Sequence, residues 1–271
     1  MTQEPVYLTT EGSIAQLILN RPAKRNALTR AMWAAIPEHA AAIAADAEVK
    51  VLVLRGATPA AFAAGADIAE FEEVFASPET ARAYQEVVHT AYDAIADLAK
   101  PTIAMVQGVC FGGGCALALC CDLRYADESA TFCIPPARLG LAYSLAETRR
   151  LVELVGPAKA KEMLMGARVI EADEALRIGL ATRLFRVAEL ESETMAFADR
   201  LCELSQFTIR ATKAVIQDIL DGAETETSRR LFEEQFRSAD YIEGRNAFLE
   251  KREPHFTWRQ TGAQKKRSGT C

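Results

Sequence analysis

The sequence predicts an α/β fold in which a largely parallel sheet precedes a helical C-terminal region. Two short apolar runs, at 51–54 and 102–106, are typical of buried strands, and a third strand is expected near residue 123. Helical patterns separate these strands. Such alternation favours right-handed βαβ units, in which each helix returns the chain to the same edge of a parallel sheet.

The pattern changes after Ser144, where one expected helix follows another and only a short strand near 182–185 interrupts them. The helices are expected at 145–155, 157–165, 171–177, 189–204, 207–221 and 225–248. We therefore divide the 271 residues into an α/β core, a helical region that packs back or swaps onto a neighbour, and a polar tail. Their bounds are 1–190, 191–258 and 259–271.

Before the core strands, residues 6–20 are typical of a hairpin around Glu11-Gly12-Ser13. Thr29 can cap a helix to Ala45, in which Pro37 predicts a kink or a restart. Residues 57–66 are expected to form a loop. It leads to Asp67, a candidate cap for a short helix, and a longer helix is expected over 79–98.

Charge and hydropathy exclude several functions. The formal net charge is −6 with the charges scattered, which leaves no basic surface for a nucleic acid. The one basic cluster, Lys265, Lys266 and Arg267, is interpreted as a solvated tail. The N-terminus has no signal pattern and no apolar run is long enough to span a membrane, so the cytoplasm is expected.

The seven cysteines are interpreted as reduced, buried side chains. Their number is odd, four of them lie between Cys110 and Cys121, and none forms a C-x-x-C pair. Neither a metal site nor a disulfide framework fits this spacing. Reduced cysteine behaves as a small hydrophobic side chain.

Two glycine-containing turns are the strongest functional signal: 62–67 (FAAGAD) and 108–114 (GVCFGGG). Each is expected to precede a helix, and the first N–H groups of a helix have no partner within it. Glycine lets such amides approach a ligand closely. Two converging amides would form an oxyanion hole, although tight helix–sheet packing is an alternative reason for three consecutive glycines.

Other nucleotide and nucleophile motifs are absent. Residues 108–114 lack the Gly-Lys-Ser/Thr ending of a phosphate loop, and neither G-x-G-x-x-G nor G-x-S-x-G occurs where it would be needed. His39, His89 and His255 have no catalytic-triad spacing and are interpreted as surface or structural residues.

Four ordered segments carry a family resemblance: 19–28 (LNRPAKRNAL), 62–71 (FAAGADIAEF), 108–122 (GVCFGGGCALALCCD) and 243–256 (EGRNAFLEKREPHF). They resemble the enoyl-CoA hydratase/isomerase (crotonase) family, and the resemblance extends to about residue 258. It implies a spiral of ββα units with a helical C-terminal trimerisation region. It also implies an acyl-CoA thioester substrate, no cofactor apart from that substrate's coenzyme A, and a homotrimer or dimer of trimers.

The resemblance assigns roles position by position. Ala66 and Gly113 would supply the two oxyanion amides. The coenzyme A nucleotide would lie along Lys24, Arg25 and the backbone around Ala27, Ala64 and Ile68. Phe232 and Lys251 fall where the family brings C-terminal residues to the acyl and phosphate ends.

The sequence departs from the family's hydratases at both catalytic acids. The two glutamate positions hold Ala116 and Pro136, neither of which can transfer a proton. Glu147 is a candidate replacement, but it also completes a capping box with Ser144. Tyr143 could reach the pocket or act as a packing residue.

These departures favour a reaction that forms its enolate without a base. Loss of CO₂ from a malonyl-type thioester does so. Residues 132–145 resemble methylmalonyl-CoA decarboxylase, with Tyr143 at its tyrosine, although that pattern has histidine at Ala66 and glutamate at Ala116. The alternatives are a true hydratase or isomerase that uses Glu147 or Tyr143, and a non-catalytic acyl-CoA-binding protein.

Overall fold

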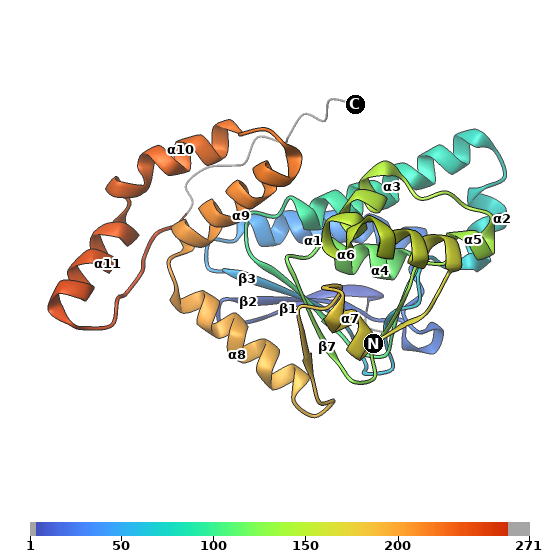
Figure 1. The fold of residues 1–271 in the computed structure, drawn as a ribbon, viewed down its shortest axis with the longest axis horizontal. Helices are drawn as coiled ribbons and strands as arrows, with labels where there is room; N and C mark the ends of the chain where they lie inside the picture. The colour runs from blue at the N-terminus through green and yellow to red at the C-terminus, as the bar shows by residue number, and fades with distance from the viewer. Residues whose placement is uncertain (1–3, 260–271) are drawn as a thin grey trace.

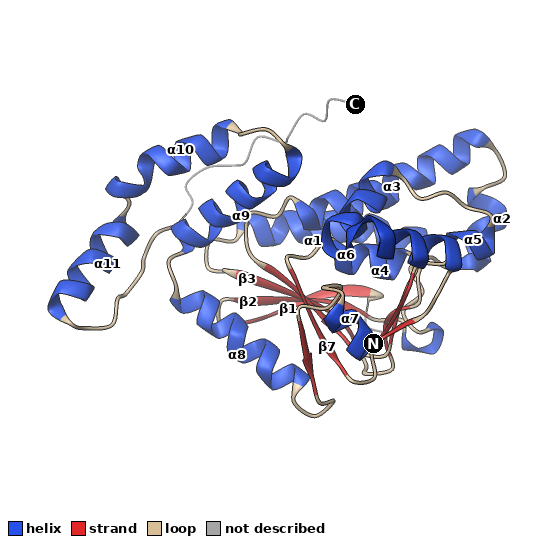
Figure 2. Ribbon diagram, viewed as in Figure 1, coloured by secondary structure: helices blue, strands red, loops and turns tan. Residues whose placement is uncertain are grey.

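The computed structural model describes residues 4–259, which form two sheets covered by helices (Figures 1 and 2). The larger sheet has the order β1-β2-β3-β5-β7-β10, in which only the β1–β2 hairpin is antiparallel. Its strands are β1 (Val6–Glu11), β2 (Ile14–Leu19), β3 (Val51–Gly56), β5 (Thr102–Val106), β7 (Leu123–Asp127) and β10 (Arg183–Phe185). The predicted parallel α/β core is therefore confirmed.

The inner strands β2, β3 and β5 are mostly apolar because both faces of the sheet are buried there. In β3, Leu52 and Leu54 face the main core, whereas Val51 and Val53 face a second, smaller core. Figure 1 shows helices α1, α3, α4 and α6 on one side of the sheet and α8 on the other. Their bounds are α1 (Arg30–Ala45), α3 (Pro78–Ala96), α4 (Gly113–Leu119), α6 (Leu145–Gly166) and α8 (Leu190–Glu203).

The structure contains a second sheet that the sequence did not predict, and two of its strands lie in the loop expected over 57–66 and in the glycine turn at 108–114. It has the order β4-β6-β8-β9 and comprises β4 (Ala61–Ala63), β6 (Val109–Phe111), β8 (Thr131–Cys133) and β9 (Ile170–Glu171). Strands of two or three residues are too short to show a periodicity of their own. The prediction of a loop over 57–66 is therefore wrong at β4, which forms because β6 pairs with it.

Several helix predictions are confirmed at their ends. Thr29 caps α1, and the helix continues through Pro37 without the predicted restart. Asp67 caps a short 3₁₀ helix, η2 (Ile68–Glu70). Gly156 leaves helical geometry within α6, so the expected boundary between 145–155 and 157–165 is present.

The predicted single helix over 225–248 is wrong. It is interrupted at Ser238, whose backbone is extended and whose side chain accepts a hydrogen bond from the Tyr241 N–H as the cap of the next helix. Two α-helices and a 3₁₀ turn result. The remaining helical elements are η1 (Pro22–Lys24), α2 (Phe71–Val74), α5 (Pro136–Leu139), α7 (Ala172–Arg177), α9 (Gln206–Asp221), α10 (Glu226–Glu234), η3 (Gln235–Arg237) and α11 (Ala239–Glu250).

The C-terminal helices project away from the core. In Figure 1, α10 and α11 lie at one end of the molecule, whereas α2 and α5 lie at the other. Large apolar side chains on these helices are exposed, among them Ile219 at 72% and Phe248 at 83%. No helix within residues 4–259 is long and apolar enough to cross a membrane.

We expect Gly114→Ala to destabilise the fold by about 1–3 kcal/mol, because its new methyl group has no space. A Cβ there would lie 2.5 Å from the Ala63 Cβ and 2.6 Å from the Ala63 carbonyl oxygen. Urea unfolding measures the change. Gly166→Ala is the control, since a Cβ at Gly166 meets nothing within 4 Å; equal stability of the two variants would contradict the prediction.

Candidate active site

The first glycine turn is held against the segment after β2 by a buried asparagine. The Asn26 side chain donates to the carbonyl oxygens of Ala61 and Phe62, at 2.9 and 3.1 Å, and accepts a hydrogen bond from the Arg21 N–H. Arg25 and Asn26 both have positive φ angles. This uncommon conformation for non-glycine residues is stabilised by the bonds that Asn26 makes.

Backbone hydrogen bonds then pair the first glycine turn with the segment after β2, and the Ala66 N–H takes no part in this pairing. Ala64 N–H donates to the Arg25 carbonyl, Leu28 N–H to the Gly65 carbonyl, and Asp67 N–H to the Leu28 carbonyl. This is the pattern of a parallel bridge between Leu28 and Ala66, in which the Ala66 N–H is not used. Within residues 4–259, that N–H donates no hydrogen bond.

Asp67 anchors the end of this turn. Its carboxylate accepts hydrogen bonds from Arg21 at 2.6 Å and from the Ala69 N–H at 3.1 Å. Burial by itself would raise the pKa of Asp67. The two hydrogen bonds and the charges of Arg21 and Lys24 outweigh burial and hold this pKa below its ordinary value.

The second glycine turn contains the start of α4. Gly112 has a positive φ angle, and its N–H donates to the Cys133 carbonyl at 2.7 Å. Gly113 is the first residue of α4, so its N–H has no partner inside the helix. The described part of the chain provides no other acceptor for it.

The two turns touch. A Cβ placed on Gly65 would lie 3.5 Å from the Gly113 nitrogen and 3.6 Å from the Gly112 Cα. The fold therefore brings Ala66 and Gly113, the two residues predicted to supply oxyanion amides, onto neighbouring turns with both N–H groups unpaired. Two such donors can stabilise a negatively charged oxygen between them.

Tyr143 lies beside the second glycine turn. Its hydroxyl is 4.0 Å from the position that a Cβ on Gly112 would occupy, and its ring packs against the main core. Burial, with a smaller contribution from the negative charge of Glu147, raises the pKa of Tyr143 well above its ordinary value. The phenol therefore stays protonated at neutral pH.

Glu147 forms the predicted capping box. Its carboxylate accepts hydrogen bonds from the Ser144 N–H at 2.9 Å and the Ser144 hydroxyl at 2.7 Å, and its own N–H donates to that hydroxyl. The same oxygen lies 3.8 Å from Nε2 of the half-exposed His89. The remaining two positions of interest, Ala116 on α4 and Pro136 at the start of α5, are buried and carry no titratable group.

The residues predicted along the coenzyme A nucleotide are partly brought together. Lys24 and Arg25 are exposed at η1, and the pairing described above places them beside Ala27 and Ala64. Ile68 follows directly and is 61% exposed, an unusual state for a large apolar side chain.

Phe232 and Lys251 are not brought to this site within one chain. Phe232 lies on α10, and Lys251 follows α11, at the opposite end of the molecule from α2 and α5 (Figure 1). Their predicted contact with coenzyme A would require a second copy of the chain.

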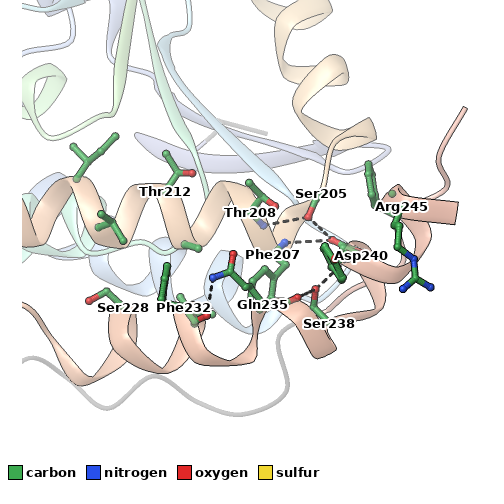
Figure 3. A pocket seen from close by; sticks show the side chains of 17 residues that line it. Ser205, Phe207, Thr208, Thr212, Ser228, Phe232, Gln235, Ser238, Asp240 and Arg245 are labelled. Atoms are coloured by element: carbon green, nitrogen blue, oxygen red, sulfur yellow. Dashed lines mark hydrogen bonds between the residues drawn. The ribbon is translucent and has the colours of Figure 1, made fainter. Parts of the chain in front are cut away.

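A cavity of about 540 Å³ lies between α9, α10 and α11, rather than at the glycine turns. Figure 3 shows Thr208 and Thr212 of α9 on one side of it and Ser228 and Phe232 of α10 on the other. Its lining contains no pair of groups arranged for acid–base chemistry, so we place the candidate active site at the glycine turns.

Sequence reasoning missed two residues that support the second turn. The buried Tyr92 hydroxyl donates to the Gly113 carbonyl oxygen at 3.2 Å, and the Trp33 ring packs edge-to-face on Tyr92 with centroids 5.3 Å apart. Both residues lie on the apolar faces of α1 and α3, where side chains of this kind are typical of a core. Only their position beside Gly113 distinguishes them.

Five of the cysteines are buried as predicted, whereas Cys202 is only partly buried. Cys110, Cys115, Cys120, Cys121 and Cys133 are free thiols in the core, and burial raises the pKa of Cys120 to about 12. Cys271 and the basic cluster Lys265, Lys266 and Arg267 lie outside the described residues.

Comparison with known proteins identifies the family of the chain. The enoyl-CoA hydratase/isomerase family model matches residues 9–259. A crotonyl-CoA hydratase from Syntrophomonas wolfei is 37% identical over 94% of this chain and 99% of its own length. A short-chain-enoyl-CoA hydratase from Clostridium acetobutylicum is 34% identical over 91% of this chain and 95% of its own.

Solved structures are similar as well. A crystal structure of an enoyl-CoA hydratase/isomerase family protein from Hyphomonas neptunium has a TM-score of 0.91 and 40% identity, covering 94% of this chain and 98% of that one. An enoyl-CoA hydratase from Bacillus anthracis has a TM-score of 0.86 at 28% identity, over 93% and 99%. The chain belongs to the enoyl-CoA hydratase/isomerase family and has the crotonase fold.

We expect Gly65→Ala to lower kcat/KM for thioester turnover at least tenfold. Gly65 has φ +100°, and an added Cβ would lie 3.1 Å from the Phe111 carbonyl oxygen, so the Ala66 amide must move. Gly12→Ala is the matched control, because Gly12 also has a positive φ but lies in open space in the β1–β2 turn. Equal activity losses in the two variants would show that strain, rather than the amide's position, matters.

Proposed function

We propose that this enoyl-CoA hydratase-type enzyme binds an acyl-CoA thioester so that the thioester oxygen accepts hydrogen bonds from the Ala66 and Gly113 N–H groups. The observation that carries the proposal is the contact of the two turns with both amides unpaired. The bonds strengthen when the carbonyl becomes an enolate, because the oxygen then carries negative charge.

The side chains around the amides favour decarboxylation of a malonyl-type thioester. The bond between the α-carbon and the carboxylate breaks, CO₂ leaves, and the electron pair passes into the enolate held by the amides. No base is required for this step. Ala116 and Pro136, which stand where the resemblance places the hydratase glutamates, are buried and apolar, and such surroundings disfavour the ionised carboxylate relative to the delocalised enolate.

Tyr143 is the proposed proton donor that converts the enolate to product. Its hydroxyl lies beside Gly112, and burial keeps it protonated. After donation to the α-carbon, the phenolate would recover a proton from solvent. A thioester enolate is more basic than a phenolate, so a raised pKa does not prevent the transfer.

Hydration of an enoyl thioester is the second candidate. The two relatives named above are hydratases. Glu147 is the carboxylate closest to Tyr143 along the sequence. Its capping bonds engage one carboxylate oxygen, and His89 at 3.8 Å could connect it to solvent. In this reading, Glu147 activates water and the same amides stabilise the resulting enolate.

A panel of malonyl, methylmalonyl and crotonyl thioesters, followed by mass spectrometry, separates the candidates. For decarboxylation, we expect CO₂ loss that falls about 10²-fold in Tyr143→Phe and changes little in Glu147→Gln. For hydration, the order reverses. Circular dichroism controls for folding, since Glu147→Gln weakens a helix cap. Binding without any product would identify a non-catalytic acyl-CoA-binding protein.

We also propose that the working form is a homotrimer or a dimer of trimers. The exposed apolar side chains of α9 to α11 support this, and so does the distance of Phe232 and Lys251 from the glycine turns within one chain. A second copy seated against these helices would bury the apolar surface.

We expect light scattering to give three or six times the mass of one chain. The double variant Ile219→Asp with Phe248→Asp should give monomers, because each change places a charge in the proposed interface. Val187→Asp, which adds a charge at a partly exposed position between β10 and α8, is the control. A parent protein that is monomeric at micromolar concentration would contradict the proposal.

A further inference from the structure

Arg21 joins the two backbone segments that hold the Ala66 amide. Its Nη1 donates to the Ala27 carbonyl oxygen at 3.0 Å and to the Asp67 carboxylate at 2.6 Å. Ala27 belongs to the segment after β2, whereas Asp67 directly follows Ala66 in the first glycine turn. One guanidinium nitrogen therefore binds both sides of the pairing.

The direction of the Ala66 N–H depends on this pairing. The Gly65 carbonyl, which belongs to the same peptide group as the Ala66 N–H, accepts a hydrogen bond from the Leu28 N–H at 2.8 Å. The peptide bonds of the described residues are trans, and in a planar trans peptide the C=O and the N–H point in opposite directions. The bond from Leu28 therefore directs the Ala66 N–H away from the segment after β2.

The contacts of Arg21 lie on either side of this peptide. Leu28, whose N–H orients the peptide, directly follows Ala27, and its carbonyl accepts a hydrogen bond from the Asp67 N–H at 2.9 Å. The backbone of Arg21 is itself fixed, because its N–H donates to the Asn26 side chain at 2.8 Å. The Arg21 and Asp67 side chains are 29% and 14% exposed, so water only partly screens their ion pair.

We propose that Arg21 is a positioning residue, which holds the Ala66 N–H in the direction that the enolate oxygen requires. The inference rests on the proposed thioester site. Without the guanidinium, the Ala27 carbonyl loses a donor and the Asp67 carboxylate loses its charged partner, so the peptide between them is less firmly oriented. A hydrogen bond weakens steeply when it is bent, so a small rotation of this amide lowers its stabilisation of the oxyanion.

Acetoacetyl-CoA is a probe that reports on the amides whichever reaction the enzyme catalyses. Its α-protons are acidic enough to form an enolate without a catalytic base, and this enolate absorbs in the near ultraviolet. We expect the parent protein to increase the enolate fraction of the bound thioester at a fixed, near-neutral pH. In Arg21→Met, the equilibrium constant for enolate formation should fall about tenfold while the thioester still binds. Arg21→Lys, which can keep a charged donor to Asp67, should recover part of the loss.

Two controls separate positioning from other roles of an arginine. Arg55 on β3 also forms an ion pair, with Glu191 of α8, and Arg55→Met should keep the parent's enolate fraction. Acetoacetyl-N-acetylcysteamine has the same reacting group but no nucleotide, and Arg21→Met should show the same loss with it. A loss confined to the coenzyme A thioester would overturn the proposal and assign Arg21 to binding of the nucleotide phosphates.

Asp67→Asn is a second variant, which keeps Arg21 and removes the charge that it binds. We expect it to lower the enolate fraction as well, and circular dichroism checks that each variant is folded. Enolate fractions equal to the parent's in both variants would overturn the role of Arg21 and leave the thioester site intact. If the parent protein itself binds acetoacetyl-CoA without enolate formation, the oxyanion amides are wrong and this inference fails with them.

Discussion

The close approach of two backbone segments is the constraint on which the rest of the site depends. Gly114 packs directly on Ala63, so α4 can begin only where the turn after β4 ends. This contact places the Gly113 N–H beside the Ala66 turn. The Asn26 hydrogen bonds and the Asp67–Arg21 ion pair then hold the first turn in register with the segment that carries Lys24 and Arg25. A side chain at position 114 would separate these parts.

The proposed site is built from backbone amides, and this has a chemical consequence. Peptide N–H groups do not titrate, so their ability to stabilise an enolate does not depend on the pH of the surroundings, and it does not select a reaction. The side chains around these amides therefore determine which reaction occurs. Here the neighbours are mostly neutral and aromatic: Tyr143 is held protonated by burial, and Tyr92 and Trp33 lie behind Gly113. Glu147 is the exception, and most of its hydrogen bonding serves the helix cap.

The starts of the C-terminal helices α9, α10 and α11 depend on local side-chain caps. Their capping residues, Ser205, Thr225 and Ser238, define each helix locally, yet many large apolar side chains of these helices stay exposed within one chain. Local hydrogen bonds therefore determine where these helices begin, and burial does not. This explains why the break at Ser238 was missed, because the hydrophobic pattern on which the prediction relied continues across it.

The sequence by itself determined the parallel sheet, most helix ends and the two glycine turns, because those features depend on local periodicity, caps and glycine. The family resemblance then pointed to Ala66, Gly113 and Tyr143. Only the tertiary structure decided the second sheet, since β4 and β6 are too short to signal themselves and form by pairing with each other. It also revealed Trp33 and Tyr92, whose proximity to Gly113 arises from packing between segments that are distant along the chain.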